Sequence, residues 1–193
     1  MKKLKFGMTG LVAVVTGAAV ALTVAATPAS AAAQMNKAGM SPAAVSPASV
    51  DLSNERAAWN YLTGHGMTDI RAAGVIGNLD QESGMDPTIA QYGGGPGRGI
   101  AQWSVGGRWD TYSQDNVVWK ANQEGKSRWN LTLQLDFIWY ELHNFSYYGF
   151  SQLHNANTID DAVIAFQNGY EGCGTCNTAA RESFAHAAYN RYH

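Results

Sequence analysis

Glu82 is the residue of this 193-residue sequence whose position best suits acid chemistry. It lies in Gly-Asn-Leu-Asp-Gln-Glu-Ser-Gly, residues 77–84, where apolar residues with helical spacing lead into a glycine. The spacing predicts a helix over about 69–83, with Thr68 as its N-cap and Gly84 just beyond its end. A carboxyl in the last turn is at the negative end of the helix dipole, which disfavours its ionised form. Burial would raise its pKa further, so Glu82 is a candidate general acid, and an ordinary solvated glutamate is the alternative.

A glycine-rich segment follows this candidate acid. Five of the seven residues 93–99 are glycine, so the backbone can approach another group closely. The segment lacks the Gly-Lys-Ser/Thr ending of a phosphate-binding loop. We expect Gly99–Trp103, which comes next, to form a short extended or turn segment that faces Glu82 across a cleft.

Apolar residues with helical spacing predict a mainly α fold of about six helices in a single domain. The expected helices are 54–63, 69–83, a shorter one within 107–121 that carries Trp109 and Tyr112, 131–143, one that follows Thr158, and 178–189. The residues expected to cap them are Ser53, Thr68, Asn130, Thr158 and Asn177. The sequence has no long alternating strand pattern and no internal repeat.

The N-terminal residues have the pattern of a secretory signal peptide. Three lysines precede an uncharged apolar run over residues 11–26, and Ala29–Ala31 fits a small-x-small cleavage site. We expect residues 1–31 to be a signal peptide, 32–51 a flexible Ala/Ser/Pro linker, and 52–193 the folded domain. The apolar run is shorter and poorer in leucine than a membrane anchor. We therefore expect a protein without a stable membrane anchor after cleavage, secreted to the extracellular space or associated with the cell wall.

The expected domain is acidic. Residues 51–193 carry nine basic and fifteen acidic side chains, which gives a formal net charge of −6. An acidic domain without a basic stripe is a poor binder of nucleic acid and of anionic membranes. The composition suits a neutral or weakly charged substrate held by stacking and hydrogen bonds, and we expect a monomer.

The two cysteines, Cys173 and Cys176, are three residues apart. In a secreted chain such a pair is most simply a structural disulfide that holds a loop. A thioredoxin-like redox role is less suitable, because no βαβ pattern surrounds the pair. A zinc site would need two further ligands, and the spacing favours neither His154 nor His186. We expect a disulfide, no metal and no cofactor.

Residues 77–87, followed by 99–103, resemble the phage tail-type lysozymes, which belong with goose-type lysozymes and lytic transglycosylases. In that group an Asn-Leu-x-x-Glu-Ser-Gly-x-(Asn/Asp)-Pro segment carries the catalytic glutamate at a helix end. A Gly-(Leu/Ile)-(Ala/Met)-Gln segment then lines the cleft. Residues 133–142 and 166–171 also resemble helices of this family. The resemblance implies a lysozyme-like catalytic domain over 52–193 that cleaves peptidoglycan glycan strands, with Glu82 as the catalytic residue.

Residue chemistry and the resemblance together predict the residues that bind the glycan. Flat rings stack on sugar rings, and amides pair with their polar groups. The expected contacts are Asn78, Ser83, Tyr92, Gln102 and Trp103, with Tyr170 and Glu171 added on the resemblance. A place in the hydrophobic core is the alternative for each aromatic residue.

The leading hypothesis is a secreted muramidase that hydrolyses the bond between N-acetylmuramic acid and N-acetylglucosamine. Hydrolysis usually needs a second carboxyl, for which Asp86, Asp110 and Glu171 are candidates. Related phage-type lysozymes carry an aspartate nine residues after the glutamate, and this sequence has Gln91 there. Without a second carboxyl, Glu82 would act as acid and then base in a lytic transglycosylase that forms anhydro products. Two further alternatives are a catalytically inactive wall-binding module, favoured by Gln91, and a cysteine peptidase.

Overall fold

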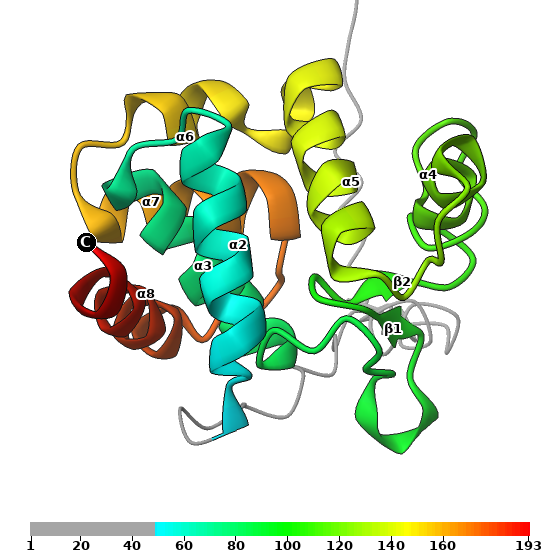
Figure 1. Ribbon diagram of the computed structural model, residues 1–193, viewed down its shortest axis with the longest axis horizontal. Coiled ribbons are helices and arrows are strands. Elements are labelled where there is room, and N and C mark those ends of the chain that lie inside the picture. Colours follow the sequence, from blue (N-terminus) through cyan, green and yellow to red (C-terminus); the bar gives the residue numbers. More distant parts are fainter. Residues whose placement is uncertain (1–48) are drawn as a thin grey trace, which may run out of the picture. The chain divides into compact units, whose positions relative to one another are not determined.

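Helices dominate residues 49–193, the part of the chain that the structure, a computed structural model, describes (Figure 1). The mainly α fold expected from the sequence is confirmed. The expected signal peptide, residues 1–31, and all of the expected linker before residue 49 lie outside the described residues. Within residues 49–193, no helix is both long and apolar enough to cross a membrane.

The described residues form seven α-helices, where the sequence predicted about six. The α-helices are α2 (Leu52–Gly64), α3 (Asp69–Ser83), α4 (Val117–Glu124), α5 (Leu131–Asn144), α6 (Phe150–Asn155), α7 (Ile159–Phe166) and α8 (Thr178–Tyr192). The shorter elements are the 3-10 helices η3 (Tyr92–Gly94) and η4 (Ser146–Tyr148), the π-helical segment η5 (Gln167–Glu171), and the strands β1 (Gly97–Arg98) and β2 (Trp103–Ser104). The additional helix, α6, has only six residues, too few to show a helical period in the sequence.

The caps explain where most helices begin and end. Asn130 accepts a hydrogen bond from the backbone N–H of Leu133 at 3.0 Å, and α5 begins where predicted. The prediction of Ser53 as the first cap is wrong, because Asp51 fills that role and accepts the Ser53 N–H at 2.9 Å. At the end of α3, Gly84 adopts the left-handed conformation with a φ of +61°, as the sequence indicated.

Two predicted caps make no side-chain bond, although their helices form. Thr68 precedes α3 and Asn177 precedes α8, and neither side chain accepts a hydrogen bond from its helix. Both helices bury an extensive face, and packing of that face stabilises a helix more than one cap does.

The helix expected within 107–121 is displaced toward the C-terminus. It begins only at Val117, so Trp109 and Tyr112 lie in turns. Asn116 is the N-cap and accepts the N–H of the third helical residue at 2.7 Å. The aromatic spacing suggested an earlier start, and the capping interaction determined the actual one.

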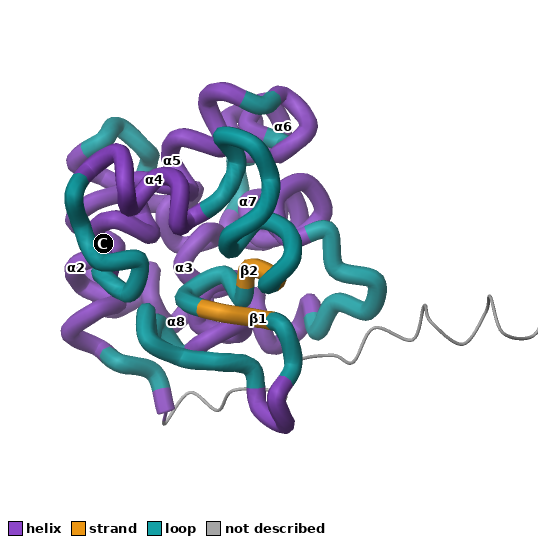
Figure 2. The backbone as a smooth tube through the Cα atoms, turned by 90° about the vertical axis from the view of Figure 1, so that its right-hand side faces the viewer, coloured by secondary structure: helices purple, strands orange, loops and turns teal. Residues whose placement is uncertain are grey.

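The segment after the glycine-rich loop forms a minimal hairpin, which Figure 2 shows in orange between loops. β1 pairs antiparallel with β2, with Arg98 opposite Trp103. Gly99 and Gln102, inside the turn between the strands, have φ values of +68° and +48°. The expectation of a short extended or turn segment at Gly99–Trp103 is confirmed.

Helix α3 is the centre of the core and packs against α7 and α8. Every residue from Ala72 to Ser83 is buried. Two glycines allow this close packing: a Cβ on Gly74 would lie 2.5 Å from the Cβ of Ala162, and one on Gly77 would lie 2.6 Å from the Cβ of Ala185. The same added Cβ on Gly77 would also collide with a backbone carbonyl of α8. The spacing of α3 and α8 therefore depends on the absence of a side chain at residue 77.

We predict that Gly77→Ala lowers the free energy of unfolding by about 1–3 kcal/mol, because overpacking against backbone outweighs the gain in helix propensity. Thermal and denaturant unfolding would measure the change. Gly64→Ala is the matched control, since a Cβ there meets nothing within 4 Å. It should leave stability unchanged or slightly higher. Equal stability of Gly77→Ala and the native chain would contradict the close-packing explanation.

Candidate active site

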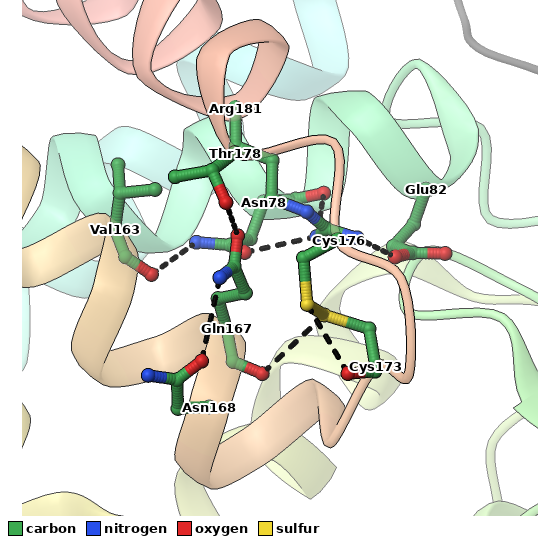
Figure 3. Close-up of a disulfide and its surroundings, with 9 residues drawn as sticks. All are labelled: Asn78, Glu82, Val163, Gln167, Asn168, Cys173, Cys176, Thr178 and Arg181. Atoms are coloured by element: carbon green, nitrogen blue, oxygen red, sulfur yellow. Dashed lines mark hydrogen bonds and ion pairs between the residues drawn. A yellow bond between two sulfur atoms is a disulfide. The ribbon is translucent and has the colours of Figure 1, made fainter. Parts of the chain in front are cut away.

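The Glu82 carboxyl lies in the last turn of α3 and is only 7% exposed. Its Oε1 accepts a hydrogen bond from Nη2 of Arg181, which lies in the first turn of α8 and is itself buried. Figure 3 shows one carboxyl oxygen facing Arg181 and the other pointing away from it. The ion pair therefore fixes one oxygen of Glu82 and leaves the other for further chemistry.

Asn78 links this pair to the packed helices. Its Oδ1 accepts a hydrogen bond from Nη1 of Arg181 at 2.9 Å. Its Nδ2 donates to the carbonyl oxygens of Gly74 at 2.8 Å and Val163 at 3.2 Å. Asn78 is fully buried, so its role in the structure is to orient the Arg181 guanidinium. Asn78 therefore lies behind the Glu82 carboxyl.

Arg181 is the functional residue that the sequence interpretation missed. A signal was present: Arg181, Phe184 and Ala188 have the i, i+3, i+7 spacing of one helical face. All three are buried, so a charged residue on an otherwise apolar face marked a buried counter-charge.

The pKa of Glu82 is raised above its usual value. Burial is the main cause, since it removes water from the ionised carboxylate. The charge of Arg181 and its hydrogen bond lower the pKa, and burial outweighs both. Burial thus favours the protonated form of Glu82, and Arg181 lies where it stabilises the ionised form.

Glu171, at the end of η5, is a second carboxyl in the same electrostatic environment. No group among residues 49–193 forms a hydrogen bond with its buried Oε1. Burial raises the pKa of Glu171 well above its usual value, and the negative charge of Glu82 raises it further, whereas Arg181 lowers it. The residue as a whole is partly exposed, so the carboxyl oxygen is shielded while part of the side chain reaches the surface.

The other two candidates for a second carboxyl stabilise turns. Asp86 Oδ1 accepts hydrogen bonds from the backbone and hydroxyl of Thr88, at 2.8 and 2.7 Å. Asp110 Oδ1 accepts the N–H of Gly106 at 2.8 Å, and this bond lowers the pKa of Asp110. Of the three carboxyls considered from the sequence, Glu171 is the one whose pKa responds to the charge of Glu82.

A second buried network contains two of the predicted glycan-binding residues, Trp103 and Tyr170. Trp103 Nε1 donates to the Tyr170 hydroxyl at 3.2 Å, and that hydroxyl donates to Glu141. Arg108 donates from Nε and Nη2 to the two carboxyl oxygens of Glu141, at 2.7 and 2.8 Å. Its Nη1 donates to the backbone carbonyl oxygen of Tyr170 at 3.0 Å. Burial raises the pKa of Glu141 to about 7, against the opposing effect of Arg108. Trp103 and Tyr170 are nearly inaccessible, so they hold the hairpin and η5 in place from beneath the surface.

The remaining predicted residues occupy different surroundings. Ser83 donates from Oγ to the Leu79 carbonyl at 2.9 Å and accepts the Met85 N–H at 3.1 Å, which closes the end of α3. Gln102 is partly exposed, and its Nε2 donates to the carbonyl oxygen of Gly99 in the same turn, at 3.0 Å. Tyr92 is 88% exposed in η3. The structure therefore bonds Glu82 and Asn78 to Arg181, places Glu171 within reach of its charge, and gives Tyr92 an exposed surface position.

The disulfide between Cys173 and Cys176 is present and holds the loop that joins η5 to α8 (Figure 3). That loop separates Glu171 from Arg181 in the chain. Both sulfur atoms are used in the bond, so neither cysteine is a free nucleophile for a peptidase. Across residues 49–193, no group of histidine, cysteine and acidic side chains is arranged to hold a metal ion.

The mainly helical domain with only a two-stranded sheet is consistent with a lysozyme-like fold. The family model of the phage tail lysozymes matches residues 53–192, so the chain belongs to that family and the resemblance is confirmed. Membership indicates, in general terms, an enzyme of cell-wall lysis that acts on peptidoglycan. A comparison with curated proteins gave no match.

We predict that Arg181→Gln raises the pKa of Glu82, because the cation that lowers it is removed. If protonated Glu82 is the active form, activity falls as pH rises through this pKa. The alkaline limb of the pH–activity profile should therefore move to higher pH, as wall-clearing assays would show. The free energy of unfolding should also fall by about 3–5 kcal/mol at alkaline pH, and by less at acid pH, where Glu82 is neutral.

Arg56→Gln is the control for this prediction, because Arg56 is exposed on α2 and its substitution changes the charge by the same amount. Its pH profile should match that of the native chain. An alkaline limb that moves to lower pH in Arg181→Gln would contradict the assigned role of the cation.

Proposed function

We propose that this protein is a secreted muramidase that hydrolyses the bond between N-acetylmuramic acid and N-acetylglucosamine in peptidoglycan. Glu82 is the general acid. The observation that carries the proposal is a buried carboxyl with a raised pKa, at the helix position that the family resemblance assigns to the catalytic glutamate. Secretion is supported by the signal-peptide pattern in residues 1–31 and by the disulfide, which is typical of oxidising compartments.

In the proposed reaction, protonated Glu82 donates its proton to the bridging oxygen as the bond from the sugar carbon to that oxygen breaks. The leaving sugar departs as a neutral alcohol, and positive charge develops on the remaining sugar ring. Glu82 becomes a carboxylate whose Oε1 already faces Arg181. The ion pair strengthens as the proton leaves, so Arg181 stabilises the transition state more than the starting state.

Glu171 is the proposed second carboxyl. Two carboxyls in one poorly hydrated site favour a state that retains one proton, since the negative charge of Glu82 raises the pKa of Glu171. The two-carboxyl mechanism requires the proton on Glu82 and the charge on Glu171, whereas the ion pair with Arg181 favours ionised Glu82 and burial favours protonated Glu171. Ionised Glu171 can then accept a proton from the water that attacks the sugar carbon, or stabilise the positive charge on that carbon.

A lytic transglycosylase is the second candidate function, and it uses Glu82 alone as acid and then base. Glu171 favours hydrolysis over this route, because a buried carboxyl is present in the electrostatic environment of Glu82. An inactive wall-binding module remains the third candidate. Gln91 favours that alternative, since its side chain accepts the Gly97 N–H at 3.1 Å and supports the hairpin.

We predict that Glu82→Gln reduces the release of sugar ends from purified cell walls by about 10²–10⁴-fold, the usual contribution of a general acid. The amide preserves the shape of the side chain, so thermal unfolding should show a folded protein. Glu182→Gln, the same substitution on α8, is the control and should remain active. Glu82→Gln with native activity would exclude Glu82 as the acid. A native chain that sediments with insoluble peptidoglycan without clearing it would instead be the inactive binding module.

We predict that Glu171→Gln moves the alkaline limb of the pH–activity profile to lower pH. Repulsion within the pair is mutual, so removing one carboxyl lowers the pKa of the other and Glu82 loses its proton earlier. Mass spectrometry of the products gives a second measurement, because hydrolysed and anhydro ends differ by one water. Hydrolysed ends from the native chain, and slower release by Glu171→Gln, support the two-carboxyl mechanism. Anhydro ends, with no effect of Glu171→Gln on rate or pH profile, would support the transglycosylase.

A further inference from the structure

A pocket of about 740 Å³ lies between two segments of the domain, residues 146–156 and 161–169. It is separate from the ion pair of Glu82, although η5 contributes to both sites. Asn168 and Gly169 of η5 line the pocket, whereas Glu171 at the end of η5 interacts with Glu82. In Figure 3, Asn168 lies on the other side of Gln167 from Arg181.

The lining of the pocket is nearly uncharged and combines polar with apolar side chains. Three side-chain amides and two serine hydroxyls contribute, together with one carboxylate, Asp161. The amides and serines are Gln152, Asn155, Asn168, Ser146 and Ser151. Amides and hydroxyls both donate and accept hydrogen bonds, which is what a neutral ligand with hydroxyl and acetamido groups requires.

Two glycines allow the two backbone segments that form the inner wall of the pocket to touch each other. A Cβ on Gly169 would lie 2.8 Å from the Cα of Gly149, and one on Gly149 would lie 2.9 Å from the Cα of Gly169. The two segments that line the pocket are thus held together by a direct backbone contact. The pocket is formed before any ligand binds, which lowers the entropic cost of binding.

Tyr147 supplies a fixed aromatic ring at this pocket. Its side chain is 64% exposed, but its hydroxyl donates to Asp115 at 3.3 Å. The ring also packs against Tyr148 and Phe145, with centroids 4.6 and 5.5 Å away. An exposed ring held at its hydroxyl and along its side is a preorganised stacking surface.

We propose that this pocket binds an N-acetylated sugar ring of the glycan strand, at a position outside the bond that is cleaved. The sugar stacks on Tyr147, and its acetamido and hydroxyl groups pair with Gln152 and Asn155. The inference rests on the proposed function, because it takes peptidoglycan as the substrate. A glycan strand is a polymer, so a chain that occupies the Glu82 site can also be held by a second site on the same domain.

The charge of the pocket favours sugar over the peptide stems of the wall. A stem peptide carries ionised carboxyl and amino groups, and it would be matched by several charged side chains. This pocket has one charged side chain among its lining residues. A second pocket, of about 660 Å³, is more charged, because its lining includes Lys120, Glu124 and Asp136. Lys120 and Glu124 form an ion pair at 3.0 Å.

The test measures binding apart from catalysis, in the Glu82→Gln background. N-acetylglucosamine tetramer is titrated into the protein and followed by calorimetry and by the NMR signals of side-chain amides. We expect the amide signals of Gln152 and Asn155 to shift. Adding Tyr147→Ala should weaken binding about five- to tenfold, the loss of one stacking contact. Adding Gln152→Ala, an exposed position on α6, should weaken it about two- to fivefold.

Tyr112→Ala is the control, since Tyr112 is also exposed (53%) but does not line the pocket. Unchanged affinity in both Tyr147→Ala and Gln152→Ala would overturn the proposal, as would equal weakening by Tyr112→Ala. A stem peptide that shifts the same amide signals while the sugar does not would also overturn it. None of these results depends on the activity of Glu82, so failure of this inference and failure of the proposed function are distinguishable.

Discussion

The ion pair between Glu82 and Arg181 joins the last turn of α3 to the first turn of α8, and most features of the site depend on it. It forms because Gly77 has no side chain, which lets the two helices approach until the guanidinium reaches the carboxyl. Asn78 holds the same guanidinium and bonds to α7 as well. Packing and electrostatics are therefore coupled, because a change in helix spacing changes the surroundings of the carboxyl.

Burial and charge act in opposite directions at this site. Removing water from Glu82 raises its pKa, and Arg181 limits the rise. Glu171 adds a second carboxyl whose pKa burial and the charge of Glu82 raise, against the opposing charges of Arg181 and Arg108. Burial and the repulsion between the two carboxyls both favour a protonated carboxyl here, and the two guanidinium groups oppose it.

The network of Arg108, Glu141, Tyr170 and Trp103 repeats the same arrangement of a buried carboxyl and a guanidinium. It connects α5, η5 and the hairpin, three elements that are far apart in the sequence. Buried ion pairs add little net stability, because desolvation opposes the attraction. Removing one partner is costly, however, so these pairs constrain how the elements are arranged. Their effect here is to place η5, and with it Glu171, beside the site.

Several properties could be predicted from the sequence because they are local. Helix α5 follows from its apolar period and from Asn130, the end of α3 from Gly84, and the disulfide from the spacing of Cys173 and Cys176. The position of Glu82 at a helix end is local as well. The predicted start of α4 was wrong and α6 was not predicted, because short helices have weak periodicity and depend on caps and tertiary contacts.

Only the tertiary structure decided which residues surround Glu82. Arg181 is about one hundred residues away in the chain, and pairing over such a distance leaves no periodic signal in one sequence. The burial of Trp103 and Tyr170, and the effect of Glu82 on the pKa of Glu171, were set in the same way. The sequence by itself determined the local elements and the catalytic candidate, since backbone preferences act over a few residues. The surroundings of the carboxyl required the folded chain, because desolvation and charge pairing depend on distances in space.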